Sequence, residues 1–453
     1  MPLLATHTEE MARIVGAAHV STDPARLARY GVDGLHPAMV VEPASREEIA
    51  AIIRLAREHK LKLMPVGGGT RLGIGAIPEG VEVAVSLARL NRVVNYEPAD
   101  LTVSVEAGVR LADFERQLAA DRLFLPLDPP YAREGTIGGI LATNATGPKR
   151  FAYGGPRDFT LGMVYVTGEG MIAKTGGRVV KNVAGYDLAK LLIGSYGTLG
   201  IITDIHFKLF PLPRESRTVI AQFREIEHAF AMRRAILRSA LQPSAVDLID
   251  GQAARILGRS PQLSSSHYSL LASVGGVEPV IDRSARELAQ MAESSQAVSL
   301  TSVTGQEETV LWERIQEFVA ALRAEAPGLT MIKASLPLAQ LGPFVRRAEE
   351  IATRFEFPSA TVARAASGIA YFSLLAGEPS EKVTERLAQA ATEIIHAGTS
   401  LGGRITLLWC PPAVKGDVNV WGPLGDDLAL MRKLKATFDP DRVLNPGRFL
   451  GGI

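Results

Sequence analysis

Three glycine-rich segments carry the residues of this chain that are best suited to hold a flat, charged ligand. The first is Pro65–Leu72, where three successive glycines follow an apolar run at 61–64. Glycines at such a turn let backbone N–H groups converge on an anion without obstruction by side chains, and a pyrophosphate is a suitable guest. The spacing is neither that of a Walker loop nor that of Gly-x-Gly-x-x-Gly opening a helix. On its own the segment fits a tight structural turn equally well.

The second segment, 135–147, combines glycines with hydrogen-bonding side chains. Thr136, Thr143 and Asn144 can bond a polar heterocycle, and Gly138 and Gly139 let the backbone close on it. A helix start with a threonine cap is the competing interpretation. The third segment, 197–203, is a turn feeding a strand, and its pattern alone favours a purely structural role.

The elements that position these segments alternate between strand and helix. Met39–Val41 is a short apolar run, Ser45 is placed to cap a helix, and apolar residues then recur at helical spacing up to Ala56. Further strands are expected at 61–64, 81–85, 101–105, 163–167 and 201–207, with a helix over 111–120. After Pro213, strand-like segments alternate with longer helical ones, which predicts an α+β domain of two ferredoxin-like halves.

Composition narrows the function classes. The 49 Lys and Arg residues balance 48 Asp and Glu residues, which argues against nucleic acid or anionic lipid as the main partner. No run of about 18 apolar residues is present and the start lacks the pattern of a signal peptide, so we expect a cytoplasmic protein without a transmembrane segment.

Metal and redox centres find little support in the sequence. The single Cys410 cannot form an internal disulfide or hold an iron–sulfur cluster alone. The eight histidines form no His-x-His or His-x-x-x-His pair, so no metal site is predicted, although distant residues can assemble one.

Five motifs in one order carry a family resemblance: Pro65–Thr70, Gly135–Gly139, the Lys181–Asp187 run with Arg157–Phe159 before it, Gly197–Thr203, and the ending Phe438–Arg448. The chain resembles the p-cresol methylhydroxylase (PCMH)/vanillyl-alcohol oxidase type of FAD-binding domain. Within that superfamily it is similar to the D-2-hydroxyacid dehydrogenase branch, and most of all to the FAD-binding E subunit of bacterial glycolate oxidase.

The resemblance implies an α+β fold with a bipartite PCMH-type FAD-binding domain and an α+β, ferredoxin-like cap or substrate domain. We expect the FAD domain at 1–213, with its core at about 38–213, the cap at 214–425, and a C-terminal segment at 426–453 that returns to the FAD domain. The FAD-contacting residues that it implies are Pro65, Val66, Gly67, Gly68, Gly69, Thr70, Arg71, Leu72, Gly135, Thr136, Gly138, Gly139, Ala142, Thr143, Asn144, Gly147, Gly197, Gly200, Ile202 and Asn445. Covalently flavinylated relatives use a histidine in the first loop; Thr70 and Arg71 stand there, so noncovalent FAD is implied.

The chain departs from the branch where catalysis is concerned. Stand-alone relatives carry closely spaced histidines and a glutamate in the C-terminal half that bind a substrate-gripping metal, whereas 370–425 holds only His396. We therefore expect an accessory or electron-transferring FAD subunit of a glycolate (2-hydroxyacid) oxidase complex. Its partners would be a catalytic flavoprotein subunit and an iron–sulfur subunit, through which it could associate peripherally with a membrane.

Two alternatives stay open. One is a self-sufficient FAD-dependent dehydrogenase of another 2-hydroxyacid or alcohol, for which Lys181, Tyr186, His206 and Arg404 are the polar residues to inspect, although no catalytic residue is assigned. The other is a scaffold subunit whose flavin site has degenerated.

Overall fold

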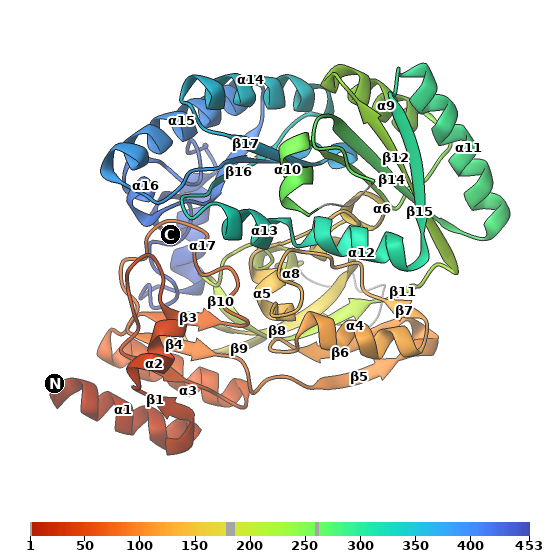
Figure 1. Ribbon diagram of the computed structural model, residues 1–453. Helices are drawn as coiled ribbons and strands as arrows, with labels where there is room; N and C mark the ends of the chain where they lie inside the picture. Colours follow the sequence, from red (N-terminus) through yellow and green to blue (C-terminus); the bar gives the residue numbers. More distant parts are fainter. Residues whose placement is uncertain (1, 178–185, 259–261) are drawn as a thin grey trace.

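The computed structural model describes residues 2–177, 186–258 and 262–453. Two blocks lie one above the other in the view of Figure 1. The lower block contains two small sheets from the first half of the chain, and the upper block is built on one large sheet. Within the described ranges, no helix combines the length and apolar character needed to cross a bilayer.

The first small sheet supports the glycine loop. Its strand order is β1-β2-β4-β3, and β2, β4 and β3 run parallel. The crossover helix α3 begins after Ser45, whose side chain accepts a hydrogen bond from the N–H of Glu48 at 3.1 Å, as the sequence predicts. The bounds are β1 Val20–Ser21, β2 Met39–Val41, α3 Arg46–His59, β3 Leu63–Val66 and β4 Val83–Ser86.

The second small sheet is antiparallel throughout, with the order β5-β6-β10-β8-β9. One apolar core joins it to the first sheet, so the two form a single packed unit. Its elements are β5 Val93–Glu97, β6 Thr102–Glu106, β8 Thr160–Thr167, β9 Ile172–Gly176 and β10 Gly200–Lys208, with the helices α4 Leu111–Ala120, α5 Ile137–Ala142 and α8 Leu188–Leu192.

The large sheet has eight strands in the order β15-β12-β14-β13-β17-β18-β16-β19. Each half reads β-α-β-β-α-β along the chain, and the halves join where Leu248 pairs with Ala363. The predicted pair of ferredoxin-like halves is confirmed. The strands are β12 Glu215–Phe223, β13 Ala245–Ile249, β14 Tyr268–Gly276, β15 Ser299–Thr304, β16 Thr330–Ser335, β17 Ser359–Arg364, β18 Ile369–Leu374 and β19 Arg404–Trp409.

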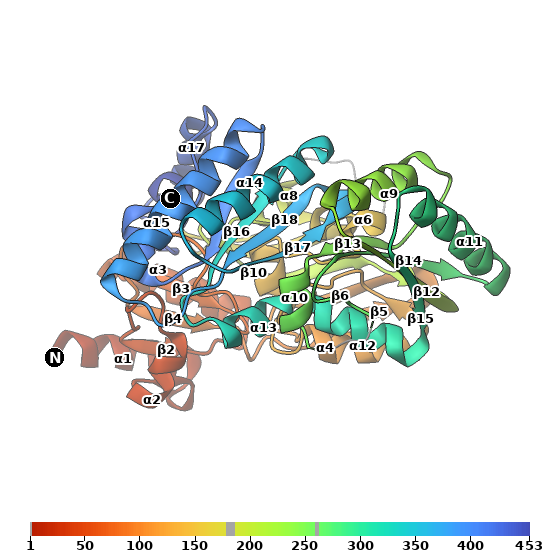
Figure 2. The same ribbon diagram turned by 45° about the horizontal axis from the view of Figure 1, so that its top comes forward.

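Helices cover both faces of the large sheet (Figures 1 and 2). The outer face packs against α9 Ile226–Arg238, α11 Glu278–Ser294, α14 Leu341–Arg354 and α15 Glu381–Ser400. The face toward the lower block packs against α10 Gly251–Ile256, α12 Gly305–Gln316 and α13 Phe318–Glu325. The helical stretch on this face is broken between α12 and α13 at Glu317.

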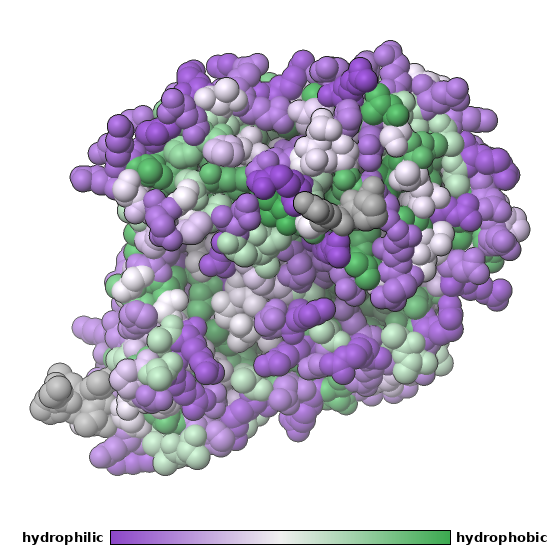
Figure 3. Space-filling model, viewed as in Figure 1, coloured by the Kyte–Doolittle hydropathy of each residue, from purple (hydrophilic) through white to green (hydrophobic). Residues whose placement is uncertain are grey.

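The end of the chain returns to the lower block. After α16 Pro412–Asp417 and α17 Leu428–Phe438, Leu444 forms a parallel bridge with Leu63 of β3. The N–H of Asn445 then donates to the carbonyl of Leu63 at 2.9 Å. The outer surface in this view is mostly hydrophilic, with paler and more apolar side chains between the two blocks (Figure 3).

Candidate functional site

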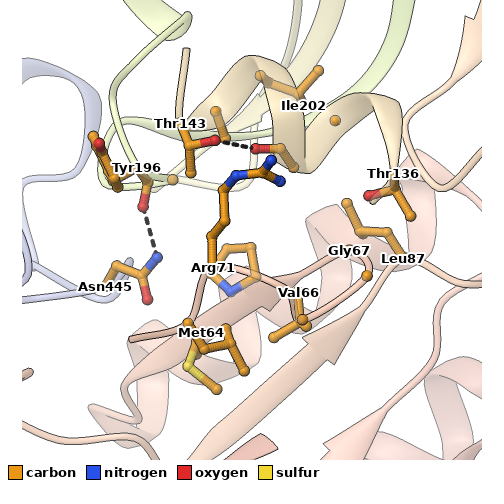
Figure 4. Close-up of a pocket in the computed structure, with 18 of the residues that line it drawn as sticks. Met64, Val66, Gly67, Arg71, Leu87, Thr136, Thr143, Tyr196, Ile202 and Asn445 are labelled. Atoms are coloured by element: carbon orange, nitrogen blue, oxygen red, sulfur yellow. Dashed lines mark hydrogen bonds between the residues drawn. The ribbon is translucent and has the colours of Figure 1, made fainter. Parts of the chain in front are cut away.

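A cavity, partly open to solvent, lies where the glycine-rich segments meet (Figure 4). Seventeen of the residues predicted to contact FAD line it: all of Pro65–Leu72, together with Thr136, Gly138, Gly139, Ala142, Thr143, Gly197, Gly200, Ile202 and Asn445.

The glycine loop is shaped by what a side chain would meet there. A Cβ on Gly67 would lie 2.0 Å from Thr136 Oγ1, and one on Gly68 would lie 1.9 Å from the carbonyl oxygen of Glu134. Gly69 has φ +71°, which side chains disfavour. Among the described residues, none accepts a hydrogen bond from the N–H groups of Gly67–Gly69. The glycine loop and the second segment therefore approach each other closely, and the N–H groups of Gly67–Gly69 are left to bond a ligand.

The surroundings of Thr136 favour one of the two interpretations of the second segment. It precedes α5 in the capping position, yet its side chain makes no capping hydrogen bond. Its Oγ1 is buried on the cavity wall without a partner among the described residues. Since buried hydroxyls are almost always bonded, this geometry fits a ligand in the cavity better than a helix cap.

Three predicted contact residues do not line the cavity: Gly135, Asn144 and Gly147. Gly147 is glycine for packing, because a Cβ there would lie 1.9 Å from the carbonyl oxygen of Asp128. Asn144 has a left-handed backbone with φ 47°, and its Oδ1 is buried without a partner. Thr143 does line the cavity, and its hydroxyl donates to the carbonyl of Gly139 at 2.8 Å.

The sequence missed six lining residues: Met64, Ile74, Leu87, Tyr196, Ile201 and Arg448. Tyr196 is the most instructive, because its backbone carbonyl accepts from Asn445 Nδ2 at 2.8 Å (Figure 4). Its ring packs on Trp421 and Phe449 with centroids 4.9 and 5.6 Å away, and burial raises its pKa to about 12. No pattern around Tyr196 in the sequence marks these long-range contacts.

Arg71 places a cation in the cavity. Its side chain points inward (Figure 4) and donates to Thr70 Oγ1 at 3.1 Å and to the carbonyl of Pro130. Burial lowers its pKa to about 10, although the charges of Tyr196 and Glu317 oppose this shift. A guanidinium in this position can bind an anionic group of a cofactor or substrate.

A buried ionic cluster fixes the stretch that follows Arg71. Lys415 Nζ lies 2.7 Å from Asp33 Oδ1 and also donates to the carbonyl of Gly73. Arg448 lies 3.1 Å from Asp33 Oδ2 and donates to the carbonyls of Leu72, Ile74 and Ala76. Burial lowers the pKa of both cations, and Asp33 opposes that effect. Asp33, Lys415 and Arg448, which are remote from 72–76 in the sequence, thus hold this stretch in place.

A second buried cluster fixes the C-terminal wall. Lys435 Nζ donates to Asp439 Oδ2 at 2.6 Å and to the carbonyls of Thr198 and Leu444 at 2.8 and 3.0 Å. Asp439 also accepts the N–H of Leu444 at 2.9 Å. This cluster joins the 197–203 segment to Asn445.

Two family models match this chain. The FAD binding domain matches residues 37–176, and the C-terminal domain of FAD linked oxidases matches 212–407 and 424–449. The chain belongs to the FAD-linked oxidases. These matches confirm FAD as the cofactor and the oxidoreductase class. The residues present fit FAD, since glycine walls and an unpartnered hydroxyl line the cavity.

Curated relatives of this FAD-linked oxidase align along most of both chains. Glycolate oxidase subunit GlcD of Bacillus subtilis is 29% identical over 416 residues, covering 91% of this chain and 88% of the relative. A D-lactate dehydrogenase of Archaeoglobus fulgidus is 29% identical, covering 90% of each chain. A D-2-hydroxyglutarate dehydrogenase of Stutzerimonas stutzeri is 26% identical, covering 97% and 98%.

Solved structures confirm the fold. Substrate-bound p-cresol methylhydroxylase superposes with a TM-score of 0.79 at 16% identity, covering 98% of this chain and 96% of the other. Alkyldihydroxyacetonephosphate synthase gives a TM-score of 0.75 at 18% identity, covering 99% and 86%.

The polar residues considered for catalysis lie elsewhere. Tyr186 is 92% exposed, and Arg404 is exposed beside Asp427. His206 Nδ1 lies 2.8 Å from Ser104 Oγ on the five-stranded sheet, and His396 is exposed on α15. None of these lines the cavity, and Lys181, with most of the Lys181–Asp187 motif, lies outside the described residues.

Proposed function

We propose that this chain is an FAD-binding subunit of a 2-hydroxyacid oxidase complex, with an accessory or electron-transferring role and noncovalently held FAD. The N–H groups of Gly67–Gly69 and the hydroxyl of Thr136 would hold the pyrophosphate. Gly197, Gly200 and Ile202 would contact the adenine and ribose, and Asn445 would face the flavin end. Bound FAD would supply the capacity to accept and pass on electrons.

The observation that carries this proposal is the chemistry of the cavity wall. Its ionisable side chains, among the described residues, are Arg71, Tyr196 and Arg448. The pKa of Arg71 is about 10 and that of Tyr196 is about 12, so both are protonated at neutral pH. Neither can take the proton of a substrate hydroxyl as a general base would. The wall binds and orients, and substrate oxidation would belong to a partner subunit.

The absence of a histidine or cysteine from the described wall supports noncovalent binding. The single cysteine of the chain supports an iron–sulfur partner, since electrons that leave this flavin need another protein's clusters. The relative GlcD is itself a glycolate oxidase subunit, which supports an assembly of several chains. Within it we propose a FAD domain at 1–213, a cap at 214–425 and a returning segment at 426–453.

Reduction of the bound flavin tests the proposal. The purified chain should be yellow, release FAD on acid precipitation, and keep its 450 nm absorbance when mixed anaerobically with glycolate or D-lactate. Adding the copurifying partner subunits should restore bleaching. Rapid bleaching of the isolated chain would overturn the accessory role, and a protein that takes up no FAD would instead support the scaffold alternative.

A self-sufficient D-2-hydroxyacid dehydrogenase is the second candidate, and the cation in the cavity favours it. Arg71 could hold a substrate carboxylate, and two relatives that are dehydrogenases align over nine-tenths or more of both chains. Under this alternative, one acid of a panel bleaches the isolated chain, and Arg71→Lys raises its KM at least ~10-fold because the bidentate contact is lost.

A further inference from the structure

The N-terminal helix α1 Pro2–Val15 lies beside α3 (Figure 1), and the two helices together bring three ligand-bearing side chains close to one another. His7 and Glu10 stand three positions apart and so share one face of α1. His59 is the last residue of α3. One ligand atom from each of these three residues can be chosen so that all lie within 4.8 Å of one another.

Two of these atoms lie close together. Glu10 Oε2 and His59 Nε2 are 3.1 Å apart, within ion-pair distance, yet both atoms are buried and neither makes a hydrogen bond of acceptable geometry among the described residues. The rings of His7 and His59 have centroids 4.5 Å apart and are tilted by 43°, so they do not stack face to face. Buried polar atoms are almost always hydrogen-bonded, so two such atoms without a hydrogen bond can accommodate a cation between them.

We propose that His7, Glu10 and His59 form a zinc site that fastens α1 to α3. Two imidazoles and one carboxylate are ligands that Zn²⁺ accepts at about 2.0–2.2 Å, which places ligand atoms about 3.3 Å apart in a tetrahedron. The Glu10–His59 separation already matches this edge, and a ring nitrogen of His7 lies within 4.8 Å, so it would move closer when the ion binds. With three protein ligands, a water molecule would take the fourth position, and the 28% and 26% exposed side chains of Glu10 and His59 lie near solvent.

The site has a structural role that is independent of the flavin cavity. The metal joins α1 to the helix whose end leads through Lys60 into β3 and the glycine loop. Zinc binding therefore stabilises the packing of α1 on the first sheet, since an ion that binds only the folded arrangement shifts the equilibrium toward it.

Zinc titration of the full-length, FAD-loaded chain tests the site. After dialysis against a chelator, calorimetric titration with ZnCl₂ at pH 7.5 should give about one ion per chain, confirmed by elemental analysis. His59→Ala and His7→Ala, on different helices, should each weaken binding by ~100-fold or more because each removes a ligand. Glu9→Gln is the matched control, since Glu9 is exposed on the same helix.

The variants also distinguish loss of the zinc site from a general loss of folding or of FAD binding. Their FAD absorbance and far-UV circular dichroism should equal those of the wild type, because the cavity lies elsewhere. Zinc should raise the Tm of the wild type and of Glu9→Gln but not that of the two histidine variants. A stoichiometry near zero, or equal affinity in wild type and His59→Ala, would overturn the proposal and leave an ordinary His59–Glu10 ion pair.

Discussion

Thr136 Oγ1 lies 2.0 Å from the point that a Cβ on Gly67 would occupy. Gly67→Ala must therefore displace the Thr136 side chain or the glycine loop, at the wall that we assign to FAD. We expect the FAD content of the purified protein to fall at least ~10-fold, read from the ratio of absorbance at 450 and 280 nm. Gly377→Ala is the control, because a Cβ there meets nothing within 4 Å. Unchanged FAD content in Gly67→Ala would remove the loop from the binding site.

Thr136→Val should have opposite effects on stability and on binding. The hydroxyl of Thr136 is buried without a partner, so replacing it with a methyl group of similar size should raise the stability of the apoprotein by about 1 kcal/mol. The same change should weaken FAD binding about tenfold if the hydroxyl bonds the cofactor. Thermal unfolding of the apoprotein and fluorescence titration with FAD measure the two effects. A variant with weaker binding and lower apoprotein stability would contradict the assignment.

Asp33→Asn should destabilise the protein strongly. It removes the negative charge between Lys415 and Arg448 and leaves two buried cations facing each other, at a cost of about 3–5 kcal/mol. Asp441→Asn removes one partner of the exposed Arg57 pair and should cost less than about 1 kcal/mol. Urea unfolding measures the free energy of unfolding of both variants. A similar loss of stability in each would show that the buried cluster is no more important to the fold than the exposed pair.

Cys410 should be unreactive in the folded protein. Burial raises the pKa of its thiol to about 12, with Lys415 acting in the opposite direction, so the reactive thiolate is scarce at pH 8. Ellman's reagent should detect about one thiol in denaturant and almost none within minutes in buffer. Rapid labelling of Cys410 in the native protein would show that the end of β19, which Cys410 follows, opens to solvent.

The titration of Asp250 should lower the free energy of unfolding as the pH rises. Burial raises its pKa from 3.8 to about 7, although the N–H groups of Ala253 and Thr361, each 2.7 Å from a carboxylate oxygen, oppose the shift. The folded state then binds more protons than the unfolded state between about pH 4 and pH 7, so unfolding free energy decreases across that window.

Asp250→Asn removes this titration. Its destabilisation relative to the wild type should be largest near pH 4 and should shrink toward pH 7, as measured by urea unfolding at constant ionic strength. A difference that is constant with pH would show that Asp250 keeps an ordinary pKa.

Local patterns in the sequence predict the glycine-rich walls of the cavity better than lining residues such as Tyr196 and Arg448. Pro65–Leu72 and Gly138–Thr143 lie where motif and resemblance put them, because a glycine that admits a close approach is visible residue by residue. Tyr196 and Arg448 were missed because their positions depend on contacts with Asn445 and Asp33, hundreds of residues away. Such contacts leave no periodic trace in the sequence.

Buried charge makes two strands of the large sheet, β13 and β17, hard to recognise in the sequence. Asp247 in β13 and Arg364 in β17 are almost fully buried and form an ion pair across the junction of the two halves. Each charge interrupts an apolar run that otherwise marks a central strand. In the fold, each of these two buried charges is compensated by the other, which lies in a different segment of the sequence.

The bridge between Leu444 and Leu63 has a consequence for how the protein is made. The Pro65–Leu72 wall of the cavity is synthesised long before Asn445 and Arg448, which line the same cavity. A nascent chain therefore lacks part of the pocket until the returning segment has been made and has paired with β3. A chain cut short before α17 should accumulate as a colourless apoprotein.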